Sequence, residues 1–334
     1  MKHGIGSWVC VVIIAFTFIS ANSYADTHKT KWRGVVKVKK AKMSGHRIIH
    51  TLRSSRNYRV QPVNYTPDHE VFQQESGSTL RLASSKAIII NQDSGEVLYA
   101  KGTDIPTPIA SVTKLMTAMV MLDAHLPMDE QITVSGADVD TLKGTGSRLR
   151  VGSVLARSEL LQLALMASEN RAAAALARST FPDGLPSFVA AMNQKAAQLG
   201  MTRSYFADGT GLRSENVSTA EDLAKMVKAA YQYPEIRQVT TTASYDVPVR
   251  GYRNPLEFHN TNVLVRNKTW EIGLSKTGFI NESGRCLVMQ AQIAGQALVI
   301  VLLDSWGKYT RIGDAQRIKK WIESSNGNSR RPVS

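Results

Sequence analysis

Pro108-Ile-Ala-Ser-Val-Thr-Lys-Leu-Met-Thr-Ala-Met-Val120 is the stretch that decides how this chain is organised. From Lys114 onward it consists of strong helix formers. Residues three positions apart on a helix share a face, so the hydroxyl of Ser111 can meet the amine of Lys114. A serine becomes nucleophilic when a base takes its proton, and a lysine desolvated among apolar neighbours can be that base. Ser-x-x-Lys alone is a weak signal, because an N-cap serine followed by a solvated lysine gives the same sequence motif.

The chain on either side of this stretch is predicted to form one sheet from its two ends. Apolar runs at 87–91 and 96–101 flank a turn, which predicts a hairpin. Near the other end we expect three strands and a closing amphipathic helix, over residues 273–279, 286–293, 297–303 and 314–323. Between them we expect helices over residues 114–124, 159–166, 171–177, 186–199 and 219–231, the last capped by Ser218. The pattern indicates an α/β (α+β) fold with an inserted helical lobe.

Two further motifs follow the Ser111 stretch in order. Ser168-Glu-Asn170 lies where one predicted helix ends and the next begins, and Lys276-Thr-Gly278 lies on a predicted strand. Ser-x-x-Lys, Ser-x-Asn and Lys-Thr-Gly in this order form a specific constellation of catalytic motifs. The three motifs together therefore indicate a serine nucleophile with its supporting groups.

Each residue of the second and third motifs has a physical task. Ser168 can relay a proton to a leaving group, and Asn170 can hold a substrate amide and the lysine. Lys276 offers a cation to a substrate carboxylate, and Thr277 adds a hydroxyl donor. Gly278 leaves the strand bare where the substrate backbone lies close.

The two lysines are expected to differ in charge. Lys114 must be neutral to accept a proton, and a nearby cation lowers its pKa. Lys276 is the expected source of that cation and is predicted to stay charged. The pKa values of the two lysines are then pushed apart.

Some other residues imitate these motifs. Ser214-Glu-Asn216 lies in a Gly-rich loop and is interpreted as structural, and Lys143-Gly-Thr-Gly146 precedes Ser168, out of order. Cys286 alternates with apolar neighbours and is predicted to be a buried small hydrophobe. Four histidines have no partner spacing for a metal or for a Ser-His-Asp triad: His50, His69, His125 and His259.

The composition is that of a folded protein. The 334 residues are 43% hydrophobic and 20% charged, which excludes a wholly disordered or fibrous chain. Cys10 and Cys286 are the two cysteines, so a disulfide scaffold and zinc sites built on paired cysteines are excluded. We expect neither a metal nor a cofactor.

The N-terminal residues 1–25 are predicted to be a cleaved signal peptide. A basic start, an apolar run at 8–19 and small residues at Ser23 and Ala25 fit export to the periplasm. The alternative is a retained membrane anchor. The C-terminal residues 324–334 are polar and predicted to be a flexible tail.

Residues 26–82 carry much of the net charge of +14, with twelve Lys and Arg against four acids. They show no clear apolar period, so we expect a largely flexible extension. It is either a solvated leader or a tether to an anionic wall or membrane surface. Nucleic acid is not an expected partner of an exported chain.

The three motifs resemble those of the serine penicillin-binding proteins of the D-alanyl-D-alanine peptidase family. Residues 108–120, Leu165-Met-Ala-Ser-Glu-Asn-Arg-Ala-Ala-Ala174 and Lys276-Thr-Gly-Phe-Ile-Asn281 are similar to its D-alanyl-D-alanine endopeptidases, the penicillin-binding protein 7 type. The resemblance covers residues 83–323, the expected catalytic domain. It implies a β-lactamase/transpeptidase-like fold, with a five-stranded antiparallel sheet flanked by helices.

The resemblance also implies a mechanism. Ser111 is acylated with Lys114 as general base, and the backbone N–H groups of Ser111 and Phe279 form an oxyanion hole. The implied substrate is the D-alanyl–diaminopimelate cross-link of peptidoglycan, and penicillins acylate the same serine. The short stretch after Gly278 favours the endopeptidase, since the larger carboxypeptidases carry a further β-domain there.

Three alternatives share these residues or this fold. A D-alanyl-D-alanine carboxypeptidase would use the same catalytic groups. A class A β-lactamase needs a Glu-x-x-x-Asn loop, and residues 171–275 contain none. A non-catalytic penicillin sensor would keep the fold but usually has transmembrane helices.

Overall fold

The computed structural model describes residues 80–249 and 252–329. The predicted signal peptide, residues 26–79 of the basic extension and the tail residues 330–334 lie outside these ranges. No helix in the described ranges is both long enough and apolar enough to cross a bilayer.

Five antiparallel strands form the main sheet in the order β2-β1-β11-β10-β9. They are β1 (Lys86–Asn91), β2 (Val97–Lys101), β9 (Glu271–Ile280), β10 (Gly284–Ile293) and β11 (Gln296–Ser305). Ile89 lies opposite Ile300, so two distant parts of the chain meet inside the sheet. The predicted sheet, built from both ends of the folded region, is confirmed.

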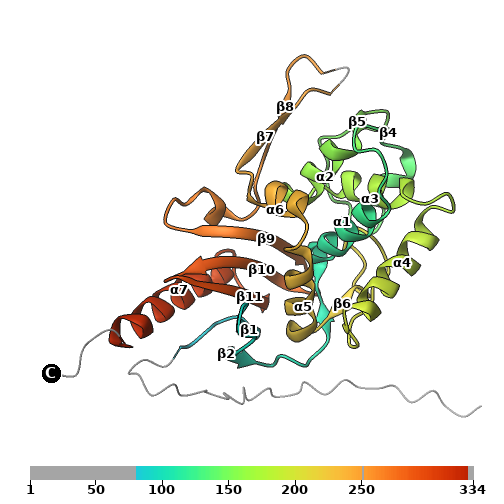
Figure 1. The fold of residues 1–334 in the computed structure, drawn as a ribbon. Coiled ribbons are helices and arrows are strands. Elements are labelled where there is room, and N and C mark those ends of the chain that lie inside the picture. The colour runs from blue at the N-terminus through green and yellow to red at the C-terminus, as the bar shows by residue number, and fades with distance from the viewer. Residues whose placement is uncertain (1–79, 250–251, 330–334) are drawn as a thin grey trace, which may run out of the picture. The chain divides into compact units, whose positions relative to one another are not determined.

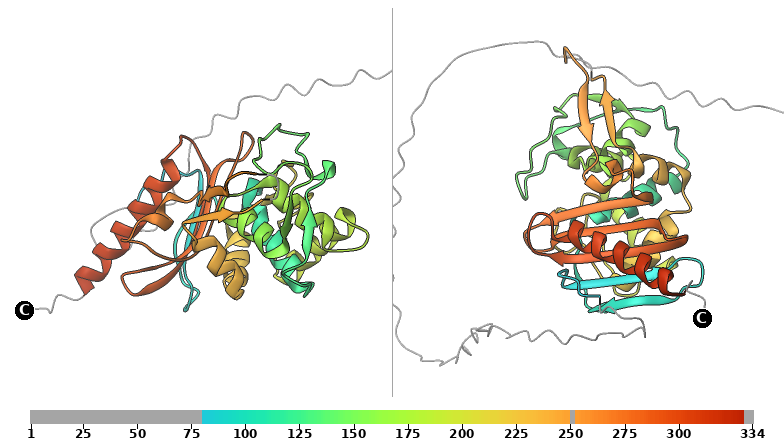
Figure 2. Two further views of the ribbon diagram at one scale, coloured as in Figure 1. Left: turned by 90° about the horizontal axis from the view of Figure 1, so that it is seen from above. Right: turned by 90° about the vertical axis from the view of Figure 1, so that its left-hand side faces the viewer.

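Helices cover both faces of this sheet (Figures 1 and 2). The long helix α7 (Thr310–Ser329) crosses one face, and α5 (Ala220–Ala230) packs against β1, β10 and β11 on the other. Residues 298–303 are therefore fully buried. A strand covered on both faces reads as a continuous apolar run rather than as an alternation, and this is the pattern in the sequence.

The middle of the chain forms the predicted helical lobe, beside the sheet in Figure 1. Its helices are the 3-10 turn η1 (Ala110–Thr113), α1 (Lys114–Asp123), η2 (Gly136–Asp138), α2 (Arg157–Met166), α3 (Asn170–Ser179) and α4 (Leu185–Gln198). Two short strand pairs accompany them, β3 (Thr107–Pro108) with β6 (Val217–Ser218), and β4 (Gln131–Thr133) with β5 (Val154–Ala156).

Some elements were absent from the sequence prediction. They are α6 (Pro234–Thr241), the hairpin of β7 (Ser244–Val247) and β8 (Leu256–His259), and the 3-10 turn η3 (Val263–Arg266). The β7–β8 hairpin projects from the body of the fold in Figure 1. Its strands are only four residues long, too short for a clear period-two pattern.

Two predicted boundaries need correction. Leu82 is buried in the core beneath α7, and its carbonyl accepts a hydrogen bond from Lys101, so packed structure includes residues assigned to the extension. Helix α7 continues to Ser329 instead of ending at 323. The hydroxyls of Ser324 and Ser325 donate to the carbonyl of Trp321, which satisfies a late carbonyl of the helix.

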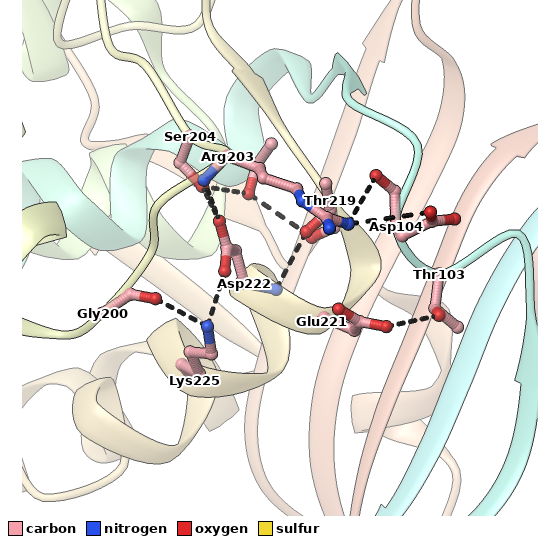
Figure 3. Close-up of polar contacts among 10 residues, drawn as sticks. Thr103, Asp104, Gly200, Arg203, Ser204, Thr219, Glu221, Asp222 and Lys225 are labelled. Carbon is pink, nitrogen blue, oxygen red and sulfur yellow. Dashed lines mark hydrogen bonds and ion pairs between the residues drawn. The ribbon is translucent and has the colours of Figure 1, made fainter.

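Figure 3 shows the polar network that holds the start of α5. Thr219 is the N-cap instead of Ser218, because its side chain accepts from the N–H of Asp222 (3.1 Å). The carboxylate of Asp222 accepts in turn from the N–H of Arg203 (2.8 Å) and the hydroxyl of Ser204 (2.9 Å). A carboxylate in the first turn of a helix is electrostatically favoured. The network attaches the loop after α4 to the start of α5. The same loop continues to the site described next.

Candidate active site

Ser111 lies on the tight turn η1, directly before helix α1. Side chains at positions i and i+3 of a 3-10 turn lie one above the other, and Lys114 Nζ comes within 2.8 Å of Ser111 Oγ. Ala110, one residue earlier, has a φ of 47°. A left-handed non-glycine residue costs on the order of 1–3 kcal/mol and persists where its surroundings impose it. The nucleophile candidate is therefore held in a strained, well-supported turn.

Lys114 is completely buried beside Ser111. Its Nζ contacts Ser111 Oγ, Asn170 Oδ1 (2.7 Å) and the backbone oxygen of Thr210 (2.7 Å). Burial lowers the pKa of Lys114 to about 7, although the nearby charges of Asp208 and Glu169 act in the opposite direction. A substantial fraction of this lysine is therefore neutral near neutral pH.

The partners of Lys114 determine where its lone pair points. A neutral amine has two hydrogens and one lone pair. The carbonyl oxygens of Asn170 and Thr210 can only accept, so they take the two hydrogens. The lone pair then faces Ser111, whose hydroxyl can donate. This arrangement can remove the proton of Ser111.

Ser168 and Lys276 form the opposite side of the site. Ser168 lies between α2 and α3 with a left-handed φ of 60°, and its hydroxyl is 2.9 Å from Lys276 Nζ. Lys276 also donates to the backbone oxygen of Thr277 (3.0 Å). The structure thus brings together side chains from all three sequence motifs.

The pKa of Lys276 is lowered by its surroundings, as that of Lys114 is. Burial lowers the pKa of Lys276 well below its usual value, and the charges of Lys114 and Arg311 lower it further. The surroundings therefore disfavour the charge on Lys276 as well as the charge on Lys114. A carboxylate bound beside Lys276 would raise its pKa again.

Arg311, which the sequence analysis missed, adds to this positive region. It lies in the first turn of α7, it is nearly buried, and its Nε has no hydrogen-bond partner within the described residues. Burial lowers the pKa of Arg311, as does the charge of Arg285. A cation in the first turn of a helix is electrostatically unfavourable, so an arginine at this place in the sequence could have indicated a functional role. Clustered cations of this kind favour binding of an anionic group.

The sequence comparisons agree with this geometry. A family model described as D-alanyl-D-alanine carboxypeptidase matches residues 73–307. The chain belongs to this peptidase family. D-alanyl-D-alanine endopeptidases of Pseudomonas aeruginosa and Escherichia coli K12 are 48% and 45% identical to it. These matches cover 73% and 75% of this chain and 78% and 80% of the relatives.

The fold of this peptidase also matches a solved relative. The crystal structure of the Streptomyces K15 DD-transpeptidase has a TM-score of 0.67 and 28% identity, over 72% of this chain and 97% of that one. The predicted penicillin-binding fold and the resemblance to the D-alanyl-D-alanine endopeptidases are therefore confirmed. The protein is a serine peptidase of the hydrolase class.

Gly278 has a packing role that the sequence analysis did not predict. A Cβ at this position would lie 2.7 Å from the backbone oxygen of Ile109 and 3.2 Å from the backbone nitrogen of Ser111. The absence of a side chain therefore lets β9 pack closely against the Ser111 turn. It also brings the N–H of Ser111 close to the strand that leads into Phe279. An oxyanion site built from these two residues requires this proximity.

The motif Ser214-Glu-Asn216 has the predicted structural role. Asn216 is fully buried, and its Oδ1 accepts from the N–H groups of Ala207 and Asp208. The loop it supports carries Thr210, the carbonyl partner of Lys114, which the sequence analysis missed. A usable signal was the glycine pair around it, because Gly211 has a φ of 81° and packs directly on Ala110.

The structure also shows the places of Cys286 and of the segment Lys143-Gly-Thr-Gly146. Cys286 is completely buried, and burial raises its pKa to about 11, so its prediction as an inert hydrophobe is confirmed. Lys143-Gly-Thr-Gly146 does not replace the Lys276 motif, as predicted, but it lies beside the site, because the hydroxyl of Thr145 is 2.9 Å from Asn170 Nδ2. In residues 80–249 and 252–329, no three His, Cys, Asp or Glu side chains cluster as a metal site would require.

Proposed function

We propose that this peptidase hydrolyses D-alanyl–diaminopimelate cross-links of peptidoglycan, as a serine D,D-endopeptidase with Ser111 as nucleophile. The observation that carries the proposal is the buried Lys114 amine, 2.8 Å from Ser111 Oγ, with two acceptors for its hydrogens. Its similarity to two D-alanyl-D-alanine endopeptidases supports the choice of substrate.

In the acylation step, Ser111 Oγ attacks the carbonyl carbon of the D-alanine residue while its proton passes to Lys114. The oxyanion that forms accepts hydrogen bonds from the backbone N–H groups of Ser111 and Phe279. As the C–N bond breaks, Ser168 passes a proton to the leaving nitrogen and is reprotonated by the proton that Lys114 took from Ser111, so that Lys114 is neutral again. Water then attacks the ester on Ser111 and releases the serine with its proton restored.

Substrate binding falls to the other half of the site. The carboxylate on the leaving amino acid lies against Lys276, Thr277 and Arg311, which together supply charged and hydroxyl donors. Asn170 binds a substrate amide as well as the lysine. Penicillins carry a carboxylate and a reactive carbonyl, so they occupy the same groups and acylate Ser111.

A carboxypeptidase activity is the second candidate, because it needs the same catalytic residues. A Bacillus subtilis relative named D-alanyl-D-alanine carboxypeptidase DacF is 30% identical. The lower identity makes this the weaker candidate. Digestion of purified cross-linked and uncross-linked muropeptides, with products weighed by mass, separates the two. Release of free D-alanine without cleavage of cross-links would reject the endopeptidase.

The essential variant is Ser111→Ala. It should abolish both hydrolysis and covalent labelling by a fluorescent penicillin, because Ser111 supplies the acylating oxygen. Its circular dichroism should match that of the parent. A folded Ser111→Ala protein that still labels covalently would reject Ser111 as nucleophile.

We also infer that the enzyme works in the periplasm, exported by the signal peptide at residues 1–25. The basic extension, predicted as residues 26–82, would then hold it near an anionic wall or membrane surface. The chain from residue 80 onward should hydrolyse soluble muropeptides as fast as the full mature chain. It should bind wall fractions less well at low salt, and equal binding would make the extension a passive leader.

A further inference from the structure

The loop at residues 140–146 is folded around one carboxylate. Asp140 accepts hydrogen bonds from the N–H groups of Leu142 (2.8 Å), Lys143 (3.0 Å) and Thr145 (2.8 Å), and from the hydroxyl of Thr145 (2.7 Å). Partial burial raises the pKa of Asp140, but these hydrogen bonds outweigh it and lower the pKa to about 2. Asp140 is therefore ionised at any working pH and can only accept.

The loop is also attached to the opposite side of the site. Lys143 forms an ion pair with Glu282, in the turn between β9 and β10. A single exposed ion pair contributes little stability. It nevertheless links the loop to the turn that follows the strand carrying Lys276. The hydroxyl of Thr145 is thus presented to the site from a defined place.

The contact between Thr145 and Asn170 has a fixed direction. The hydroxyl hydrogen of Thr145 is committed to Asp140, so its oxygen is available to accept. It therefore pairs with the NH₂ of Asn170, at 2.9 Å. The other end of the same amide, Oδ1, must then face Lys114, where it lies 2.7 Å from Nζ.

This direction matters most when Lys114 is neutral. A charged lysine has only hydrogens to offer and orients the Asn170 amide by itself. A neutral lysine could instead accept a hydrogen bond from the NH₂ of a flipped Asn170. Its lone pair would then be occupied, and the Ser111 hydroxyl would lose its base. The active protonation state therefore needs a second group that prevents the flip.

We propose that Thr145, locked by Asp140, is a positioning residue that holds the Asn170 amide so that neutral Lys114 keeps its lone pair on Ser111. The proposal rests on the proposed function, in which Lys114 is the general base. The Asp140 carboxylate accepts from the hydroxyl of Thr145, whose oxygen accepts from the NH₂ of Asn170. The oxygen of the Asn170 amide then accepts from Lys114. Thr145 does not touch the substrate in this role.

The test compares Thr145→Val, Thr145→Ser and the control Thr141→Val, the same substitution in the same loop at an exposed residue. The measurement is the rate of acylation by a fluorescent penicillin from pH 5.5 to pH 9. Thr145→Val should acylate roughly three- to tenfold more slowly at pH 8, the effect of one lost hydrogen bond. Thr145→Ser should restore most of the rate, and Thr141→Val should match the parent.

The pH profile distinguishes a positioning role of Thr145 from a general distortion of the loop at residues 140–146. Without the Thr145 acceptor, the Asn170 amide can flip, but only when Lys114 is neutral. The flipped amide donates to Lys114 and so stabilises its neutral form. The midpoint of the pH profile should therefore move to lower pH. The charges that bear on Lys114, those of Asp208, Glu169 and Lys276, are unchanged in these variants. A merely distorted loop would slow acylation without moving the midpoint.

Two results would overturn the proposal. One is a Thr145→Val enzyme with the rate and midpoint of the parent. The other is an equal loss in the valine and serine variants with an unmoved midpoint. If Thr145→Val does not fold, Asp140→Asn tests the same lock, because its amide can donate to Thr145 and free the hydroxyl hydrogen. A parent enzyme that penicillin never acylates would instead reject the proposed function.

Discussion

Lys114 and Lys276 occupy two sides of one site, and both are almost completely buried. Burial lowers the pKa of each. Their partners differ, however. Lys114 has two oxygens that can only accept, a hydroxyl, and nearby acids. Lys276 has cationic neighbours. Burial alone therefore does not assign a lysine its role: in the proposed function the partners of Lys114 suit a base, and those of Lys276 suit the binding of an anion.

The largest expected effect comes from changing the base. Lys114→Arg keeps a cation at the position but cannot accept a proton, because a guanidinium does not deprotonate in proteins. Acylation by penicillin should fall roughly 10²- to 10⁴-fold, the loss typical of a missing general base. Rapid-mixing fluorescence with labelled penicillin measures this rate. If Lys114→Arg acylates nearly as fast as the parent while Lys276→Arg is inactive, the two roles are reversed.

A smaller loss is expected on the other side of the site. Lys276→Gln removes the charge proposed to meet the substrate carboxylate, so kcat/KM should fall roughly 10- to 100-fold. The matched control is a substrate whose terminal carboxylate is blocked as an amide. The variant should handle that substrate nearly as well as the parent does. An equal loss on both substrates would mean that Lys276 acts on the reacting groups themselves.

The smallest effect is a titration of the unchanged enzyme. Lys114 acts as a base only when it is neutral, and its pKa is about 7. Acylation should therefore rise with pH through that value and fall as the lysine gains its proton, by roughly tenfold from pH 8 to pH 6. Stopped-flow labelling across this range checks the sign. A rate that decreases as pH rises from 6 to 8 would contradict a neutral lysine base.

The sequence was sufficient for the motifs because their spacing is distinctive. It identified Ser111, Lys114, Ser168, Asn170 and the Lys-Thr-Gly strand, all of which meet in the structure. Groups that act through a backbone atom or a lone hydroxyl leave no such pattern. Thr210 contributes a backbone carbonyl, which any residue could supply. Thr145 lies in Lys143-Gly-Thr-Gly146, a segment that resembles the Lys-Thr-Gly motif.

The fold was predictable to a similar degree and for similar reasons. Strands buried on both faces and long helices have strong periodic signals. The β7–β8 hairpin has short strands, and its place depends on contacts made by the lobe, such as Arg148 stacking on Phe258 (3.9 Å). Such contacts between distant segments cannot be read from local pattern. The packing of Gly278 against Ile109 could not be predicted for the same cause, since Ile109 is far from it in the chain.

The pairing of Ile89 with Ile300 has a consequence for how the protein is made. Contacts between such distant residues form late, since the loop between them must close first. During synthesis, β1 emerges early as an apolar β-branched segment and has to wait for β11, with an unpaired edge that invites aggregation. Ser111 likewise emerges long before the strand that completes its surroundings. The proposed nucleophile therefore precedes in the chain the strand β9 that brings Lys276 to the site, so we expect activity only after the last strands have joined the sheet.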